Sequence, residues 1–555
     1  MRSLRQVLFA LVLACAAPAQ KISPPANAAV QVQKIFAGFN HTDSPGCAVG
    51  ASIDGATVLN AAYGMADLEH NIALSPDSVF EPGSVTKQFT AAAVLLLAQD
   101  GKLSLDDPVS KYIPELPDYG STITIRHLLH HTSGLRDWGE VAEVGGWPRG
   151  TRANSNVNVL DIAIRQKALN YPPGAEYSYT NTGYNLLAIL VGRVAGKSLA
   201  EFTRERIFLP LGMASTEWRD DYQRIVRNRA IGYTQTGGST RQDMPFENAY
   251  GNGGLLTTVG DLLRWNRNFT EMKVGGPAFI QAQLRPGRLN DGRTIAYAAG
   301  LMVLSYKGLR EVSHDGATAG YRGWLARYPD QGLSVALLCN TGAANPGQLG
   351  RAVADVYLTG VLPRHVAEAS APVDSTVLQA EAGLYRSERD HTEVSVELKD
   401  GHLQIGTNAI LKAVSAKSFV RGEDGPAIDF EAEPSGKVIR MRLANEIDGG
   451  EYYEKVARAN PSRTDLEAMT GEYRSDEAEV TLKVALEQNG LAIHRRPDAV
   501  IPLTPTYRDG FSSSMGSVRF IRDSGGRVIE MSIGSSRMWD LRLPRILPVN
   551  SMNKK

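Results

Sequence analysis

The sequence is poor in cysteine, carries no excess charge and has no long apolar run in its interior. Three cysteines in 555 residues exclude a small protein held together by a dense disulfide framework. The 59 basic and 59 acidic side chains cancel, so no net positive charge is available to hold nucleic acid or an anionic membrane. Past the first residues, no apolar stretch is long enough to span a bilayer. We therefore expect neither nucleic-acid binding nor a transmembrane segment.

Two frequent hydrolase motifs are missing as well. The chain contains neither a Gly-x-Ser-x-Gly elbow nor a His-Glu-x-x-His zinc motif. The segment Gly192–Ser198 looks like a phosphate-binding loop, but it is one residue short and follows a helical stretch, so it predicts the end of a helix. We predict no metal ion and no organic cofactor.

The first 19 residues have the features of a secretory signal peptide. Arg2 and Arg5 precede a short apolar stretch, Val7–Ala14, and Ala17-Pro18-Ala19 supplies small residues at a cleavage site. We expect residues 1–19 to be removed and the mature protein to be exported, either periplasmic or secreted. Cys15 resembles a lipoprotein processing site, but the fit is poorer, so we favour simple cleavage over lipid anchoring.

The chain is too long for a single hydrophobic core, and its character changes near residue 365. Before that point helical and extended patterns alternate. Cys47–Val58 predicts a hairpin that turns at Asp54-Gly55, and Ser84–Gln99 predicts a helix. We place one mixed domain at residues 27–365, followed by a linker at Ala369–Val373.

The remaining residues predict two copies of a small all-β domain. Gly383–Ser387 matches Gly471–Ser475, and Phe430 matches Phe520, at offsets of 88 and 90 residues. Alternating apolar residues and Asp-Gly or Asn-Gly turns mark strands and hairpins in both copies. Two copies are too few for a solenoid, so we expect each to close as its own barrel, at residues 375–458 and 465–547.

Ser84 and Lys87 stand three residues apart at the predicted start of a helix. These positions share a helix face, so the Lys87 amine can reach the Ser84 hydroxyl. Serine becomes a nucleophile when a base takes its proton, and an amine can do so only when neutral. The positive end of the helix and nearby cations would lower the pKa of Lys87. By itself the pair favours the alternative interpretation, an N-capping serine beside a solvated lysine.

Further motifs change that interpretation. The segment Glu81–Gln88 resembles the nucleophile segment of the class C β-lactamase-like family of serine hydrolases. Tyr179-Thr180-Asn181 is similar to the Tyr-x-Asn element of that family, and His314-Asp315-Gly316 is similar to its third element. Their order and spacing agree over roughly residues 30 to 360, which makes the combined signal specific.

The resemblance implies an α/β (α+β) fold of the serine β-lactamase type. It implies an antiparallel sheet flanked by helices, a helical lobe, and an active site between them. The two β repeats resemble the lipocalin-like barrels attached to D-aminopeptidase-type enzymes. We hypothesise that one barrel places a loop over the active site and limits substrate size; the alternative is an attachment module without a catalytic role.

The resemblance also implies roles for individual residues. Ser84 would be acylated, and Lys87 would accept its proton. Tyr179, with a pKa lowered by nearby cations, would pass a proton to the leaving group, and Tyr177 is the rival for this role. Asn181 would orient Lys87 and donate to a substrate carbonyl.

The third element would border the substrate. Gly316 would allow a strand edge to approach closely, and the backbone N–H groups of Ala317 and Ser84 would form the oxyanion hole. His314 occupies the position where classical β-lactamases carry lysine, and a neutral histidine holds an anion less firmly. This difference argues against efficient β-lactamase activity.

We therefore predict a serine hydrolase that acts through an acyl-enzyme on small amides or esters. D-aminopeptidase, D-alanyl peptidase and esterase activities are the candidates, with a short-peptide or small-molecule substrate that includes cell-wall fragments. The alternatives are a weak β-lactamase, a penicillin- or peptidoglycan-binding sensor that never turns over, and a structural envelope protein. The sequence leaves the oligomeric state open.

Two cysteines remain once the signal peptide is removed. Cys47 and Cys339 would then be the available pair in an oxidising compartment, either as buried free thiols or as a disulfide. The resemblance places their two strands side by side in the sheet. A Cys47–Cys339 disulfide is therefore a candidate.

Overall fold

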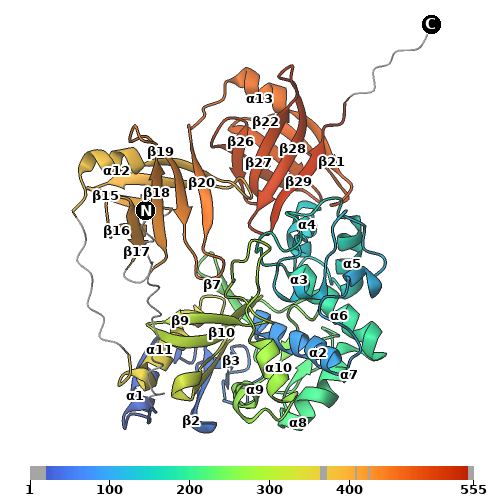
Figure 1. The fold of residues 1–555 in the computed structure, drawn as a ribbon, viewed down its shortest axis with the longest axis vertical. Coiled ribbons are helices and arrows are strands. Elements are labelled where there is room, and N and C mark those ends of the chain that lie inside the picture. The colour runs from blue at the N-terminus through green and yellow to red at the C-terminus, as the bar shows by residue number, and fades with distance from the viewer. Residues whose placement is uncertain (1–20, 363–371, 407–408, 423–424, 548–555) are drawn as a thin grey trace, which may run out of the picture.

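The computed structural model describes residues 21–362, 372–406, 409–422 and 425–547 (Figure 1). The predicted signal peptide and most of the predicted linker lie outside these residues. No helix in the described ranges combines the length and the apolar composition that a membrane crossing requires.

A six-stranded antiparallel sheet forms the centre of the N-terminal unit, residues 21–362. The strand order is β2-β1-β12-β11-β10-β9. The bounds are β1 (Cys47–Ile53), β2 (Ala56–Tyr63), β9 (Met302–Tyr306), β10 (Leu309–Thr318), β11 (Tyr321–Tyr328) and β12 (Leu333–Cys339). Asp54 and Gly55 both adopt positive φ, 48° and 81°, so the predicted β1–β2 hairpin is confirmed at its predicted turn.

Helices cover both faces of this sheet. Alternate residues of β1 and β12 pack against α1 (Ala28–Ile35) and α11 (Pro346–Leu358) on one face. The opposite face packs against α9 (Val259–Glu271), and Gly50 in β1 leaves room for the Leu263 and Val259 side chains of that helix. Because both faces are buried, the sequences of β1 and β12 are nearly continuous apolar runs and do not alternate between apolar and polar residues.

The cysteine pair joins two neighbouring strands of the sheet. Cys47 begins β1 and Cys339 ends β12, and the two residues are direct antiparallel partners. Their sulfur atoms form a disulfide across a sequence separation of 292 residues. Both side chains are fully buried.

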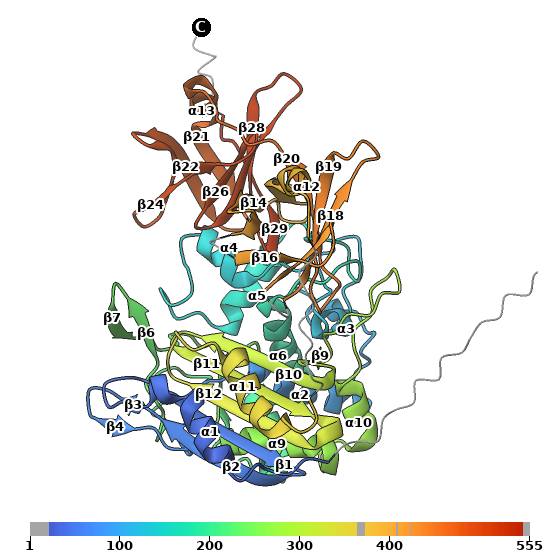
Figure 2. The same cartoon turned by 90° about the vertical axis from the view of Figure 1, so that its left-hand side faces the viewer.

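A helical lobe packs beside the sheet around the long apolar helix α2 (Lys87–Gln99). In Figure 2, α4, α5 and α6 lie above the strands of the sheet, on the side that faces the β repeats. The other described helices of this unit are α3 (Ile125–Leu129), α4 (Trp138–Val144), α5 (Asn156–Arg165), α6 (Asn181–Ala195), α7 (Leu199–Thr203), α8 (Leu209–Leu211) and α10 (Gly276–Gln283). Two-stranded pairings complete it: β3 (Met65–Asp67) with β4 (Ile72–Ala73), β5 (Glu217–Trp218) with β8 (Leu255–Leu256), and β6 (Tyr233–Thr236) with β7 (Ser239–Gln242). The segment resembling a phosphate loop is the end of α6, as predicted.

The first β repeat is a closed eight-stranded barrel. A short helix, α12 (Ser375–Glu381), leads into it. The strands are β13 (Gly383–Ser387), β14 (Glu393–Lys399), β15 (His402–Ile405), β16 (Ala409–Ala413), β17 (Ser418–Arg421), β18 (Ala427–Ala432), β19 (Val438–Leu443) and β20 (Glu451–Val456). Closure pairs β13 with β20, so every described strand has two neighbours.

The second β repeat divides into a four-stranded and a five-stranded sheet. It begins with α13 (Arg463–Met469). The strands are β21 (Gly471–Ser475), β22 (Val480–Glu487), β23 (Gly490–Arg495), β24 (Ala499–Pro502), β25 (Thr504–Pro505), β26 (Gly510–Ser513), β27 (Gly516–Arg522), β28 (Val528–Ser535) and β29 (Met538–Pro544). The division falls between Pro502 and Pro505, which have no N–H group to continue the ladder. The copy is barrel-like. Its strands do not form one continuous sheet, which differs from the closed barrel that we predicted.

Equivalent contacts in the two repeats support the duplication. Tyr385 donates its hydroxyl to the carbonyl of Glu381 at 2.5 Å, and Tyr473 donates to Met469 at 2.7 Å. The rings of these tyrosines lie 5.8 Å from Phe430 and Phe520, respectively. The matched sequence segments therefore occupy matched positions in the two folds.

Both repeats lie at one end of the molecule, against the N-terminal unit (Figures 1 and 2). The second repeat docks on the helical lobe through a nearly buried ion pair, Arg136 to Glu477 at 2.7 Å. The first repeat contacts the same unit through Arg389, which reaches Glu176 at 2.7 Å. Charged side chains thus fix both repeats next to the face where the predicted site residues lie.

Candidate active site

Ser84 lies on a tight turn that leads directly into α2. The turn is a 3-10 segment, η2 (Gly83–Thr86), so the α-helix starts at Lys87 rather than at Ser84 as predicted. Behind the turn, Glu81 and Arg219 form an ion pair at 2.8 Å in which both side chains are only 1% exposed. This pair anchors the segment that carries Ser84.

The Lys87 amine points back at the serine from the first turn of α2. Its Nζ lies 3.1 Å from Ser84 Oγ, 2.9 Å from Asn181 Oδ1 and 2.7 Å from the carbonyl oxygen of Asn252. The side chain is fully buried, and no carboxylate among the described residues lies within salt-bridge distance of Nζ. Burial, and then the Arg537 guanidinium, hold the pKa of Lys87 well below its usual range.

A neutral amine fits this environment. It has two N–H donors and one lone pair, and three oxygen atoms surround Nζ. The carbonyl oxygens of Asn181 and Asn252 can only accept, so they take the two N–H groups. The lone pair then faces Ser84, whose hydroxyl can donate to it. In this form Lys87 could receive the proton of Ser84.

Asn181 and Tyr179 reach the same site from the start of α6. Asn181 is the first residue of the helix, and its backbone N–H donates to the carboxylate of Asp137 at 2.7 Å. The Tyr179 ring lies with its centroid 4.9 Å from Lys87 Nζ. The Tyr179 hydroxyl is buried and has no hydrogen-bond partner of good geometry among the described residues. A buried hydroxyl without a partner is rare unless a bound molecule supplies the partner.

The pKa of Tyr179 does not fall as predicted from its cationic neighbours. Burial raises the pKa of Tyr179, and the opposing influence of the Ser84 hydroxyl and of Arg537 is smaller. Tyr179 is therefore a neutral phenol that can donate a proton. Tyr177 also lines the pocket, and burial raises the pKa of Tyr177 well above its usual range.

Strand β10 approaches the serine turn more closely than a side chain would permit. A Cβ atom added to Gly316 would lie 2.0 Å from the carbonyl oxygen of Pro82 and 2.5 Å from the backbone nitrogen of Ser84. A Cβ added to Gly83, which has φ of 54°, would lie 2.5 Å from the backbone nitrogen of Ala317. The backbone N–H groups of Ser84 and Ala317 are thus brought together at the edge of the site.

His314 makes its contacts within the protein. Its Nε2 lies 3.0 Å from the Tyr297 hydroxyl, and its Nδ1 lies 2.5 Å from the carbonyl oxygen of Asp315. Burial lowers the pKa of His314, so the ring is neutral, with Nδ1–H donating to the carbonyl and Nε2 accepting from Tyr297. Neither nitrogen is left to contact a substrate. His314 thus lines the pocket with both ring nitrogens occupied, and the catalytic role predicted for it from the sequence stays a prediction.

His131 has a structural role beside the site, as expected from the sequence. Its Nδ1 accepts from the backbone N–H of Thr180 at 3.2 Å, and its ring packs against Tyr179 with centroids 4.2 Å apart. It is buried and adopts a left-handed φ of 57°, which is uncommon for a residue other than glycine. His131 therefore fixes the segment that carries Tyr179 and Asn181.

A pocket of about 510 Å³ lies over Ser84 and is completed by both β repeats. Ser84, Tyr179, Asn181, His314, Gly316 and Ala317 line it together with Ile447 and Arg537. Ile447 lies between β19 and β20 of the first repeat, and Arg537 lies between β28 and β29 of the second. Only one repeat was predicted to reach the site, and the structure brings both.

Comparison with known proteins decides the family. The sequence profile of the family described as Beta-lactamase matches residues 32–358, which is more than half of the chain. The chain belongs to the β-lactamase family. The predicted resemblance is thereby confirmed, as is the predicted fold class of an antiparallel sheet with helices followed by barrel-like domains.

Two curated relatives of this β-lactamase-family chain differ in how much of it they match. Penicillin-binding protein 4* of Bacillus subtilis (strain 168) is 31% identical over 312 residues, which is 52% of this chain and 67% of the relative. D-aminopeptidase of Gluconobacter oxydans (strain 621H) is 26% identical over 450 residues, 80% of this chain and 82% of the relative. The second alignment is longer than the family region, so it also includes residues of the β repeats.

A solved structure shows the same fold. The octameric penicillin-binding protein homologue from Pyrococcus abyssi superposes with a TM-score of 0.54 at 21% identity. The match covers 77% of this chain and 99% of that chain. At this identity the likeness concerns the fold of the β-lactamase-family unit and not its substrate.

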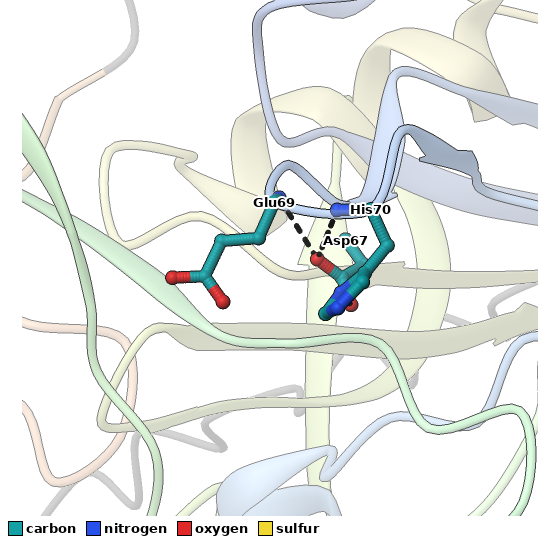
Figure 3. Close-up of side chains that lie close together, drawn as sticks. All are labelled: Asp67, Glu69 and His70. Atoms are coloured by element: carbon teal, nitrogen blue, oxygen red, sulfur yellow. Dashed lines mark hydrogen bonds and ion pairs between the residues drawn. The ribbon is translucent and has the colours of Figure 1, made fainter.

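An exposed cluster of possible metal ligands lies on the loop after β3 (Figure 3). It consists of Asp67, Glu69 and His70. The Asp67 carboxylate makes hydrogen bonds within the loop (Figure 3). Its Oδ1 accepts from the backbone N–H groups of Glu69 and His70 at 2.9 and 3.1 Å. The Nδ1 atom of His70 lies 2.7 Å from Asp67 Oδ2. These contacts stabilise a turn, and we assign no metal to it.

Proposed function

We propose that this protein is a serine hydrolase that acts through an acyl-enzyme on Ser84. The observation that carries the proposal is the environment of Lys87: a fully buried amine, 3.1 Å from Ser84 Oγ, with two carbonyl acceptors. Holding a lysine in this way without a carboxylate is unfavourable for stability, and such perturbed groups concentrate at functional sites. A solvated lysine beside an N-capping serine would show none of these features.

In the first half-reaction Ser84 attacks the substrate carbonyl carbon. Its hydroxyl proton passes to Lys87 Nζ while the Oγ–carbon bond forms, and the negative charge moves to the carbonyl oxygen. The N–H groups of Ser84 and Ala317 stabilise that oxygen. Tyr179 donates its proton to the leaving nitrogen or oxygen as the bond to carbon breaks, and the Lys87 ammonium returns a proton to Tyr179.

The second half-reaction repeats these steps with water. Lys87 takes a proton from a water molecule that attacks the acyl carbon, and the proton then returns to Ser84 Oγ as the acid leaves. Asn181 holds Lys87 through its Oδ1 atom, so its amide NH₂ group is available to donate to the substrate. His314 and His131 position the surrounding segments.

We propose small amides and esters as substrates, with peptides of D-amino acids as the leading group. A pocket of about 510 Å³ has the size of typical small-molecule sites. The D-aminopeptidase relative aligns over 80% of this chain, including part of the β repeats that complete the pocket. Cell-wall fragments would meet such an enzyme outside the cytoplasm, in keeping with the export signal expected at residues 1–19.

Hydrolysis of p-nitrophenyl acetate by the purified protein tests the proposal. Turnover should fall by at least about 1,000-fold in Ser84→Ala, whereas Ser198→Ala, which removes a helix-capping serine away from the pocket, should leave it unchanged. Mass spectrometry should detect an acetyl group on Ser84. Turnover that does not depend on Ser84 would refute the proposal. A single acylation without turnover would instead support the sensor that the sequence left as an alternative.

The two candidate tyrosines form a matched pair for the proton-transfer step. Tyr179→Phe should lower kcat by about 100-fold or more because the leaving group loses its proton donor. Tyr177→Phe removes a hydroxyl from the same pocket and should stay within a few-fold of the parent. The opposite ranking would transfer the role to Tyr177.

A further inference from the structure

Arg537 places a positive charge in the pocket. The residue is half-buried at the tip of the β28–β29 hairpin, and its guanidinium carbon lies 4.9 Å from the centroid of the Tyr179 ring. Within the described ranges, its guanidinium has no carboxylate at salt-bridge distance and donates no hydrogen bond. Arg149, which lines the same pocket, differs because it binds Glu247, with Nε 3.1 Å from a carboxylate oxygen.

The hairpin tip is held firmly against the helical lobe. The carbonyl oxygen of Arg537 accepts from the backbone N–H of Asp137 at 3.1 Å and from the Asn170 side chain at 3.2 Å. The neighbouring carbonyl, Ser536, accepts from Ser178 at 3.2 Å. Asp137 also binds the backbone of Asn181, so the Arg537 backbone is tied to the catalytic segment. The backbone that carries the guanidinium is therefore fixed, and the guanidinium lies over the Tyr179 ring with its N–H groups free of hydrogen bonds to the described residues.

We propose that Arg537 binds a carboxylate of the substrate and makes this enzyme selective for short peptides with a free carboxyl group. Arginine offers two parallel N–H donors that match a carboxylate, and the half-buried setting strengthens the charge-assisted hydrogen bonds. The pocket also holds the exposed carboxylate of Asp315, with 63% of its side chain accessible. The two opposite charges suit an unblocked peptide, which carries both an ammonium and a carboxylate.

The geometry limits how far that carboxylate lies from the scissile bond. Lys87 Nζ and the guanidinium carbon of Arg537 each lie 4.9 Å from the centroid of the same ring, that of Tyr179. Lys87 Nζ in turn lies 3.1 Å from Ser84 Oγ. The distance from Ser84 Oγ to the guanidinium carbon of Arg537 is thus at most the sum of these three distances. An extended residue spans about 3.5 Å, so the carboxylate belongs within about three residues of the bond that is cleaved.

The proposal rests on the function proposed for Ser84, but its test does not require turnover. We would use Ser84→Ala protein and measure the binding of D-alanyl-D-alanine and of D-alanyl-D-alaninamide by titration calorimetry. The acid should bind about 10- to 100-fold more tightly than the amide. Adding Arg537→Met should reduce this ratio to within about twofold, with little effect on the amide. Arg537→Lys should keep part of the preference.

Arg508→Met is the matched control, because it removes an exposed charge from the same repeat outside the pocket and should leave the ratio unchanged. Equal or undetectable binding of acid and amide, or a preference that survives Arg537→Met, overturns the proposal. The two proposals fail separately. If the protein does not hydrolyse the ester but still binds the acid more tightly than the amide through Arg537, only the proposed catalysis is refuted. If the protein hydrolyses the ester but binds acid and amide equally, only the carboxylate site is refuted.

Discussion

Gly316→Ala should impair catalysis while leaving the fold intact. The backbone of Gly316 does not have the positive φ that only glycine tolerates, so alanine is compatible with β10 itself. The added methyl group would nevertheless lie 2.0 Å from the Pro82 carbonyl oxygen and 2.5 Å from the Ser84 nitrogen. Since carbon and oxygen pack at about 3.5 Å, β10 and the serine turn would have to separate by more than 1 Å.

Such a separation acts directly on the two N–H groups that face the substrate oxygen. A misplacement of about 1 Å can lower a rate by about 100-fold, and the loss of one oxyanion donor costs about 100- to 1,000-fold. We therefore expect kcat/KM for p-nitrophenyl acetate to fall by at least about 100-fold in Gly316→Ala. Since the contact involves backbone on both sides, a flexible side chain cannot absorb the strain.

Gly260→Ala provides the control for this measurement. Gly260 lies in α9, where an added Cβ would meet no atom closer than 3.7 Å. That variant should retain full activity and gain slight stability, because alanine favours the helix. Thermal unfolding and circular dichroism would show that Gly316→Ala remains folded. Activity within about threefold of the parent in folded Gly316→Ala would refute the close approach as the basis of the oxyanion site.

Three further predictions follow from the charges around the site. Arg537→Met should raise the pKa of Lys87, because a neighbouring cation is removed, and so shift the rising limb of the pH–rate profile for a neutral ester to higher pH; an unshifted limb would contradict this. Burial raises the pKa of Glu140 from 4.5 in the unfolded chain to about 7. Between these two pH values the unfolded chain releases a proton that the folded chain keeps, so stability falls as pH rises from about 4.5 to about 7, by about 3 kcal/mol in all. Glu140→Gln should therefore raise Tm more at pH 8 than at pH 5, and an equal change at both would be inconsistent with that pKa. Glu81→Gln should destabilise the protein by about 3–5 kcal/mol in denaturant unfolding, because it leaves the Arg219 charge buried and unpaired; a change below about 1 kcal/mol would show that the pair is not needed.

Much of the fold could be predicted because the signals are local. The β1–β2 hairpin follows from two adjacent residues, Asp54 and Gly55, that accept positive φ. The β repeats follow from a two-residue alternation and from matched segments, and the structure places Tyr385 and Tyr473 in equivalent contacts. The start of α2 was misplaced by three residues because a 3-10 turn and an α-helix have similar local preferences.

Predictions about electrostatics were less successful because they depend on burial. The sequence suggested cations near Tyr179, and the structure places Arg537 there, but desolvation outweighs its charge and raises the pKa of Tyr179. The sequence also did not show that Tyr297 and the Asp315 carbonyl occupy both ring nitrogens of His314. The sequence pattern does not show which polar atoms become buried away from water when the chain folds.

The sequence by itself determined the family, the order of the motif-bearing segments and the repeated β units, because each is recognised from short motifs and from their order and spacing along the chain. Only the tertiary structure decided what completes the pocket. It joined Cys47 to Cys339 across 292 residues and brought Ile447 and Arg537, from two separate repeats, to the same cavity as Ser84. Those contacts depend on how the units dock, and docking is set by long-range shape, burial and ion pairs such as Arg136 with Glu477.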